Sequence, residues 1–279
     1  MNIPFLRFGE RGERLHFAHA NGYPPAAYTP LLKALGERYR VCAMEARPLW
    51  PDASHAVLTD WRPLAGDLIT FLETRFPGEA VVGMGHSVGG NATLRAALYR
   101  PELFRSLVLV DPVLFPPFVG AWWNLIYFLG LGYRLHPLAR GALRRRRKFE
   151  SKQAMFENYR RKRVFSRMDD DALQAYVDAL AEPDPAGEGV RLRYAPEWEA
   201  RIYVTGLRTD GEIWRKLPRL RLPVLVIRGA HTDTFWEKTA ARFQRRVPHA
   251  EIVTLGDSTH LLPLERHAEV ARLVREFAG

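Results

Sequence analysis

Short apolar runs alternate with amphipathic stretches over most of this 279-residue chain, and this alternation constrains the fold more than any other feature. The runs are rich in Val, Leu and Phe and include RLHFAHA, YRVCAME, EAVVGMG, RSLVLVD, LPVLVIRG and AEIVTLGD. Helix-like patterns separate them, among them TDWRPLAGDLITFLETRF and LERHAEVARLVREFA. Strands that are apolar on both faces and alternate with helices indicate an α/β fold. We expect a mostly parallel, doubly wound sheet that is covered on both sides.

The alternation breaks between two of the predicted strands. The interrupted region begins with FPPFVGAWWNLIYFLGLGYRL and continues with helical polar patterns and Pro/Gly turns. We therefore expect a core formed by residues 1–113 and 214–279, with a mainly helical cap inserted at residues 114–213. Because ligands of open α/β folds bind at the carboxyl edge of the sheet, the cap is predicted to cover that edge.

Composition excludes several classes of protein. The single cysteine, Cys42, rules out a disulfide within the chain, and the first residues lack the pattern of a secretory signal peptide, so a cytoplasmic protein is expected. The net charge of +10 suits acidic partners, but the basic residues are scattered and no nucleic-acid motif is present, which argues against sequence-specific nucleic-acid binding. No phosphate loop, dinucleotide fingerprint or metal-ligand cluster is found, so no cofactor and no metal are predicted.

The stretch GHSVG places Ser87 between Gly85 and Gly89, directly after one apolar run and before a helix-like pattern. Glycines on either side allow a sharp strand-to-helix turn that presents the serine hydroxyl. The amide of Val88, at the start of the helix, is then free to donate to negative charge that develops during a reaction. This context favours a nucleophilic serine over a glycine-rich turn with a capping serine.

A nucleophilic serine needs a base and a carboxylate that orients the base. His260 follows the last predicted strand and is the expected base. Asp233, after the penultimate strand in LVIRGAHTDTF, is the preferred carboxylate on strand order. Asp111, after an earlier strand in LVLVDPV, and Asp257, nearest to His260 in the chain, remain as the second and third alternatives.

Taken together, GHSVGG, RGAHTDTF and GDSTHLLPLE resemble the nucleophile elbow, acid turn and histidine loop of the α/β-hydrolase family. The resemblance covers nearly the whole chain outside the predicted cap. A serine at the nucleophile position is similar to the esterase-type branch. The resemblance implies an α/β-hydrolase fold and a triad of Ser87, His260 and Asp233.

Two motifs depart from the family pattern. In FAHANGYPP, Ala20 stands where the family has glycine, and the backbone amide of Asn21 is the first choice for the second oxyanion donor beside Val88, ahead of Ala20 and Gly22. His19 in this motif is expected to be structural. In EARPLWPD, a large indole replaces a glycine-rich turn, so Trp50 is predicted to lie near the pocket mouth and to shape it for an apolar substrate.

The start of the predicted cap is aromatic and its end is basic. Its prolines, its glycines and Asn124 argue against a transmembrane span. The preferred interpretation is a pocket roof for an apolar acyl or aryl group, formed by the aromatic residues Trp122, Trp123, Tyr127 and Phe128. The basic run Arg144–Lys148 could contact an anionic membrane surface, although a solvated helix face is the alternative.

The predicted function is hydrolysis of a small apolar ester or thioester through an acyl-enzyme. One alternative is a ligand receptor of the same fold that keeps the triad without turnover. Another is carbon–carbon bond hydrolysis or perhydrolysis, which use the same triad.

Overall fold

Seven strands form the main sheet of the computed structural model, which describes residues 3–279. Their order is β1-β3-β2-β4-β5-β9-β10, and every neighbouring pair is parallel except β1 with β3. The strands are β1 (Phe5–Phe8), β2 (Arg14–Ala18), β3 (Arg40–Met44), β4 (Val81–His86), β5 (Phe104–Val110), β9 (Val224–Gly229) and β10 (Glu251–Leu255). The prediction of an α/β fold with a mostly parallel sheet is confirmed. The antiparallel edge strand β1 is an addition to the six apolar runs identified in the sequence.

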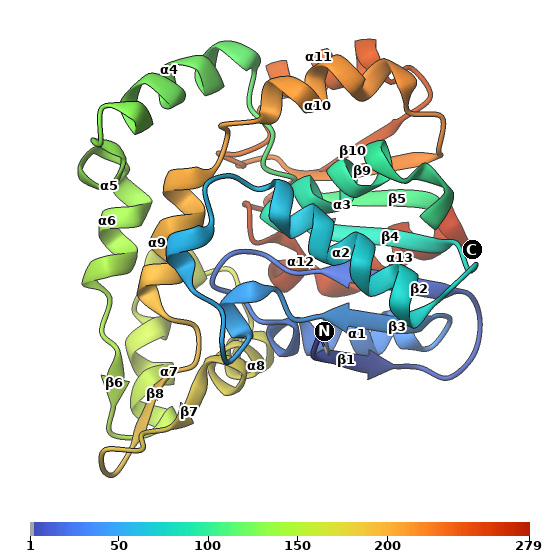
Figure 1. The fold of residues 1–279 in the computed structure, drawn as a ribbon. Helices are drawn as coiled ribbons and strands as arrows, with labels where there is room; N and C mark the ends of the chain where they lie inside the picture. Colours follow the sequence, from blue (N-terminus) through green and yellow to red (C-terminus); the bar gives the residue numbers. More distant parts are fainter. Residues whose placement is uncertain (1–2) are drawn as a thin grey trace.

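Helices cover both faces of this sheet (Figure 1). One core cluster contains buried residues of α1 (Thr29–Gly36) and α13 (His267–Ala278), and the other contains buried residues of α2 (Arg62–Arg75), α3 (Val88–Tyr99) and α11 (Glu237–Arg246). A short helix, α12 (Leu262–Glu265), precedes α13. All six residues of the central strand β4 are buried, as expected for a strand packed on both sides.

The chain between β5 and β9 leaves the sheet and folds mainly as helices. These are α4 (Pro117–Phe128), α5 (Gly132–Leu135), α6 (Pro137–Arg144), α7 (Lys152–Arg160), α8 (Asp170–Leu180), α9 (Pro196–Thr205) and α10 (Asp210–Lys216). Three short strands, β6 (Lys148–Phe149), β8 (Val190–Leu192) and β7 (Ala181–Pro183), pair into a small antiparallel sheet. Side-chain caps fix two of the helix starts, since Ser151 and Asp169 accept backbone N–H groups of α7 and α8.

The insertion packs against the core at several points. The rings of Tyr23 and Tyr176 stack with centroids 4.8 Å apart, which joins α8 to the loop after β2. At the other end, Asn91 on α3 donates to the carboxylate of Asp210 on α10 over 3.1 Å. Figure 1 shows α4, α5 and α6 following one another along one side of the molecule, away from the sheet. The boundaries 114–213 of a separate cap domain remain a prediction.

None of the helices within residues 3–279 combines the length and the apolar character needed to cross a membrane.

Candidate active site

Ser87 lies at the turn between β4 and α3 in a backbone conformation that is rare for a residue with a side chain. Its φ is 59° and its ψ is −123°. A Cβ atom on Gly85 would collide with the backbone of Gly89, and one on Gly89 would collide with the carbonyl of Ala18. Glycine is therefore required on both sides of the serine, and the strained turn expected from GHSVG is present.

His260 follows β10 and directs its imidazole at this serine. Its Nε2 lies 2.9 Å from the Oγ of Ser87, within hydrogen-bond distance. Its Nδ1 lies 2.7 Å from the Oδ2 of Asp111. Because a carboxylate only accepts, Nδ1 carries the hydrogen, which leaves Nε2 free to accept the proton of the serine hydroxyl. The predicted pairing of Ser87 with His260 is present in the structure.

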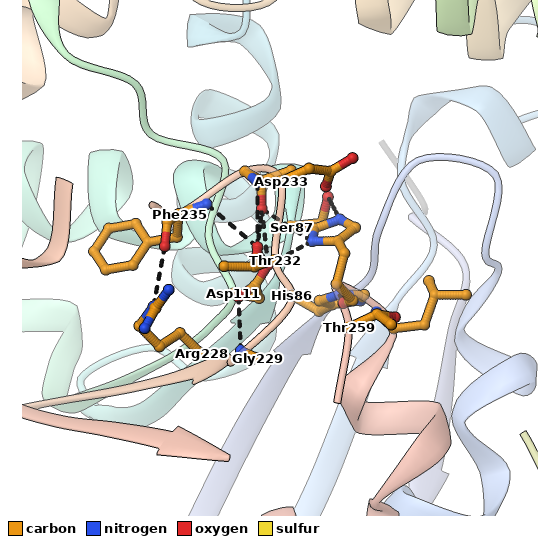
Figure 2. Close-up of polar contacts among 12 residues, drawn as sticks. His86, Ser87, Asp111, Arg228, Gly229, Thr232, Asp233, Phe235 and Thr259 are labelled. Carbon is orange, nitrogen blue, oxygen red and sulfur yellow. Dashed lines mark hydrogen bonds and ion pairs between the residues drawn. The ribbon is translucent and has the colours of Figure 1, made fainter. Parts of the chain in front are cut away.

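The carboxylate at the imidazole is Asp111, and the expectation that Asp233 fills this place is wrong. The Asp111 side chain is fully buried directly after β5 and accepts a hydrogen bond from the Gly229 amide over 3.1 Å (Figure 2). The Thr234 hydroxyl also donates to it, over 2.8 Å. Thr232 is a further donor to it. These donors satisfy a charge that burial would otherwise make costly.

The turn after β9 directs the side chains of Thr232 and Thr234, and not that of Asp233, at Asp111 and His260. The Asp233 side chain is exposed, and no hydrogen bond joins its carboxylate to His260 within residues 3–279. The third candidate, Asp257, is exposed and pairs with Arg167. The strand-order argument thus selected the correct edge of the sheet but the wrong strand.

His86 links three loops of the site. Its Nε2 lies 2.8 Å from the carbonyl oxygen of His260, so Nε2 carries the hydrogen. Burial lowers the pKa of His86 well below its usual value and keeps the ring neutral. Its Nδ1 then accepts the hydroxyl hydrogen of Tyr28 over 2.8 Å, and the same hydroxyl oxygen accepts the Ala20 amide over 3.2 Å.

The two amides predicted as oxyanion donors border the same cavity as Ser87. Val88 is the first residue of α3, where backbone amides have no acceptor within the helix. The side chain of Asn21 is fixed by donation to the Glu199 carbonyl over 3.0 Å and by acceptance from the Tyr194 hydroxyl over 2.9 Å. His19 holds this loop as expected of a structural residue, since Ala46 donates to its Nε2 over 3.0 Å. The roles of the two amides stay a prediction.

A cavity of about 900 Å³ opens above Ser87 and His260, between the core and the insertion. The volume suits a ligand of drug size. Apolar side chains from both parts of the chain form much of its wall: Trp61, Val113, Phe115, Leu138, Val164, Ile202, Leu207 and Leu261. Polar groups at its wall include Tyr23, Tyr203, Arg163 and Arg167, and Asp233 contributes here as a wall residue.

The aromatic residues predicted to form the pocket roof do not line this cavity. Trp122 and Phe128 point to solvent with 67% and 76% of their surfaces exposed, so this prediction is wrong for them. Trp123 and Tyr127 pack on the inner side of α4, where the Trp123 indole donates to the Val204 carbonyl over 2.9 Å. Helix periodicity places residues on faces, but only the packing of α4 on α9 decides which face meets the pocket.

Trp50 is also absent from the cavity wall. It packs partly buried against the second core cluster, and its indole nitrogen donates to the Glu45 carbonyl over 2.7 Å. The apolar side chains that do line the cavity were missed. Phe115 could have been found, because it follows β5 at the carboxyl edge of the sheet. Trp61 carried no such indication, since it lies before a helix far from the motifs in sequence.

The chain matches the family model described as the alpha/beta hydrolase family over residues 17–273. The protein belongs to the α/β-hydrolase family. The prediction that it is a hydrolase enzyme of this family is thereby confirmed.

Among curated proteins, an uncharacterized hydrolase of Bacillus subtilis is 22% identical over 98% of this chain and 97% of its own length. A type I acyl-CoA thioesterase of Penicillium roqueforti is 31% identical over 119 residues, which are 37% of this chain but only 27% of that protein. The chain thus spans about a quarter of that thioesterase's length.

Three solved structures illustrate the likeness of fold. E-2-(acetamidomethylene)succinate hydrolase superposes with a TM-score of 0.79 at 20% identity, over 99% of this chain and 94% of that one. The thioesterase domain from the curacin biosynthetic pathway gives 0.77 at 17% identity and covers 99% of both chains. An esterase from M. tuberculosis superposes with a TM-score of 0.73 at 21% identity, over 98% of this chain and 88% of that one. At these identities the likeness shows the shared fold.

Proposed function

We propose that this α/β-hydrolase is a serine hydrolase that cleaves an ester or thioester of an apolar acyl or aryl group. The observation that carries the proposal is the unbroken hydrogen-bond sequence from Ser87 through His260 to the buried Asp111. In this mechanism the Ser87 oxygen attacks the carbonyl carbon while Nε2 of His260 takes the hydroxyl proton. The imidazolium then returns that proton to the departing alcohol or thiol, and an acyl-enzyme remains.

Asp111 serves this cycle by holding the imidazole in the correct tautomer and by stabilising its positive charge. The amides of Val88 and Asn21 are proposed to hold the oxyanion of the tetrahedral intermediate, from the two sides of the cavity that they border. Water that attacks the acyl-enzyme is deprotonated by His260 in the same way, and the imidazolium then returns the proton to the Ser87 oxygen as the acid leaves. The apolar wall of the cavity supports an apolar acyl group, and the esterase and thioesterase relatives support the same class of substrate.

The test compares four variants on p-nitrophenyl esters of increasing chain length. Ser87→Ala is expected to lower kcat by about five to six orders of magnitude, and Asp111→Asn by about 10³- to 10⁴-fold. Asp233→Asn is the matched control, because it removes an exposed carboxylate at the same cavity and should leave kcat within about threefold of wild type. His260→Ala should match Ser87→Ala.

Fluorophosphonate labelling followed by peptide mapping gives a second readout that does not depend on the substrate chosen. The label is expected on Ser87 and should be lost in Asp111→Asn at matched times. Labelling at another residue, or Asp233→Asn losing as much activity as Asp111→Asn, would refute the proposed triad. Stable ester binding without turnover would point instead to a receptor of this fold.

A further inference from the structure

Helix α4 turns its more apolar face outward. On the inner side, Asn124 donates to the Arg208 carbonyl over 3.1 Å and the Trp123 indole donates to the Val204 carbonyl over 2.9 Å. The outer side carries exposed Phe118, Trp122, Leu125 and Phe128, together with Leu129 at the end of the helix, with exposed fractions of 64%, 67%, 51%, 76% and 63%. A helix on the surface of a protein in water normally shows the opposite arrangement. This face therefore matches an apolar partner better than it matches water.

The exposed apolar surface continues along the insertion. Helices α5 and α6, which follow α4 along the same side of the molecule in Figure 1, add Leu135, Leu138 and Leu143, exposed by 50%, 52% and 39%. We call these three leucines, the four exposed α4 residues and Leu129 the apolar outer face. Single exposed apolar residues are ordinary, but eight of them along α4, α5 and α6 and the turn after α4 form a larger set than most soluble surfaces carry.

The charged side chains of the segment that carries the apolar outer face all have one sign. Residues 112–149 contain seven Lys and Arg and no Asp or Glu. Within the basic run, Arg145, Arg147 and Lys148 are already paired with acidic residues, which are Glu199, Glu197 and Asp184. Arg134, Arg140 and Arg144 are exposed and have no ion-pair partner among the described residues. Three free cations thus lie beside exposed aromatic and aliphatic side chains.

This combination selects one occupant. A second copy of the chain, pairing through the same face, would bring these arginines close to their own counterparts with no acidic residue in the segment to neutralise them. An anionic bilayer supplies both an apolar layer for the side chains and negative headgroups for the arginines.

We propose that the apolar outer face rests on an anionic membrane surface, with Trp122 and Phe128 inserted at the headgroup level and the cavity open toward the lipid. Leu138 on α6 and Val164 in the 3₁₀ helix Arg163–Phe165 line the catalytic cavity and are also exposed to solvent by 52% and 53%. The cavity wall is therefore continuous with the outer surface at these two residues. An acyl chain leaving a bilayer could follow this apolar path to Ser87 without crossing water.

The docking itself does not rest on the proposed hydrolysis, so the experiment uses Ser87→Ala protein, which cannot consume a lipid ester. The full chain is sedimented with vesicles of phosphatidylcholine alone and with vesicles in which phosphatidylglycerol replaces part of the phosphatidylcholine. We expect stronger binding to the anionic vesicles. Adding Trp122→Glu with Phe128→Glu should weaken that binding about tenfold or more, because two aromatic anchors are replaced by charges of the headgroup's own sign.

Two controls make the test specific. Val57→Glu alters a side chain that is also 64% exposed but lies outside the apolar outer face, and its binding should equal that of the parent. Changing Arg134, Arg140 and Arg144 together to Gln should reduce binding to anionic vesicles to the level seen with phosphatidylcholine. The thermal unfolding of each variant, followed by circular dichroism, should match that of the parent, which shows that the variants fold.

The proposal is overturned if the parent binds neither vesicle, or if the Trp122→Glu, Phe128→Glu variant binds as well as the parent. It is equally overturned if the parent is a dimer that this variant dissociates while vesicle binding is absent, since a second copy would then cover the face. Failure of hydrolysis in the wild-type protein would leave vesicle binding unaffected, so the two proposals are tested separately.

Discussion

The imidazole of His86 shows how one side chain can join several loops of a site. It donates to the backbone of His260 and accepts from Tyr28, whose hydroxyl oxygen also accepts the Ala20 amide. The nucleophile turn, the histidine loop and the loop of the proposed oxyanion amide are thereby connected through neutral groups. Because Ala20, Tyr28 and His86 are buried, a hydrogen bond that one of them fails to make is costly. Tyr28 and His86 are positioning residues in this interpretation.

Replacing Tyr28 by Phe is expected to lower kcat about five- to tenfold with little change in KM, because the Ala20–Asn21 loop loses its anchor while the cavity keeps its shape. Stability should fall by about 1–3 kcal/mol, since Nδ1 of His86 is left without a donor. Tyr39→Phe is the matched control: Tyr39 is equally buried and donates to the Val274 carbonyl over 3.4 Å, away from the site. Steady-state kinetics in which both variants keep wild-type kcat would contradict a positioning role for Tyr28.

At the scale of elements, the turn from β4 to α3 depends on how closely two segments of backbone approach each other. Gly89, the second residue of α3, lies directly against the carbonyls of Ala18 and His19, at the carboxyl end of β2. This contact places the start of α3 beside the loop that contains Asn21. The strand-turn-helix unit therefore fixes the position of Ser87 relative to a neighbouring strand as well as its own conformation.

Gly89→Ala is expected to destabilise the protein by about 1–3 kcal/mol, because the new methyl group meets backbone that cannot move aside easily. Activity should fall further than the loss of stability alone explains, since displacing the start of α3 also moves Ser87 and Val88. Gly66→Ala provides the control: a Cβ at this position in helix α2 meets nothing within 4 Å. That change should stabilise by about 0.5–1 kcal/mol through helix propensity. Chemical denaturation of both variants measures the change in the free energy of unfolding, which should be negative for Gly89→Ala and positive for Gly66→Ala. Equal changes in the two variants would contradict the close approach of Gly89 to the backbone of β2.

On the scale of the whole molecule, the core holds several histidines in neutral form. Burial lowers the pKa of His16 to about 3 and that of His19 to about 4, and it lowers the pKa of His86 well below its usual value. Neither ring nitrogen of His16 has a hydrogen-bond partner in residues 3–279. Asp210 acts in the opposite direction, because burial raises its pKa to about 6 and its contribution to stability fades as the pH rises through that value.

The histidines outnumber this aspartate, so the folded state is expected to lose stability on acidification from pH 6.5 toward about 4. In that window the unfolded chain binds protons that the folded chain refuses, which lowers the free energy of unfolding. His16→Leu should reduce the loss by about 1.4 kcal/mol per pH unit. His249→Gln, at an exposed histidine, should leave the slope unchanged. Urea denaturation between pH 6.5 and about 4 measures the free energy of unfolding at each pH. If this free energy falls with pH at the same slope in His16→Leu and in wild type, His16 is excluded as a cause of the loss.

The sequence by itself determined the α/β class, six strands of the sheet, the strained serine and its histidine partner. These features follow from local rules: apolar runs form buried strands, and only glycine tolerates the backbone around Ser87. The sequence did not identify Asp111 as the preferred carboxylate. Asp111 and Asp233 follow two neighbouring strands, and their order in the chain does not tell which of them lies within hydrogen-bond distance of His260.

Only the tertiary structure decided which face of each inserted helix meets the cavity. The sequence shows plainly that α4 is rich in aromatic residues, yet the packing of α4 on α9 turns Trp122 outward. Phe115, Trp61 and Leu138 line the cavity instead. Helix periodicity defines faces relative to one another, and the direction of each face depends on contacts with segments about 80 residues away, such as Trp123 with Val204. Contacts of that separation are a property of the folded chain.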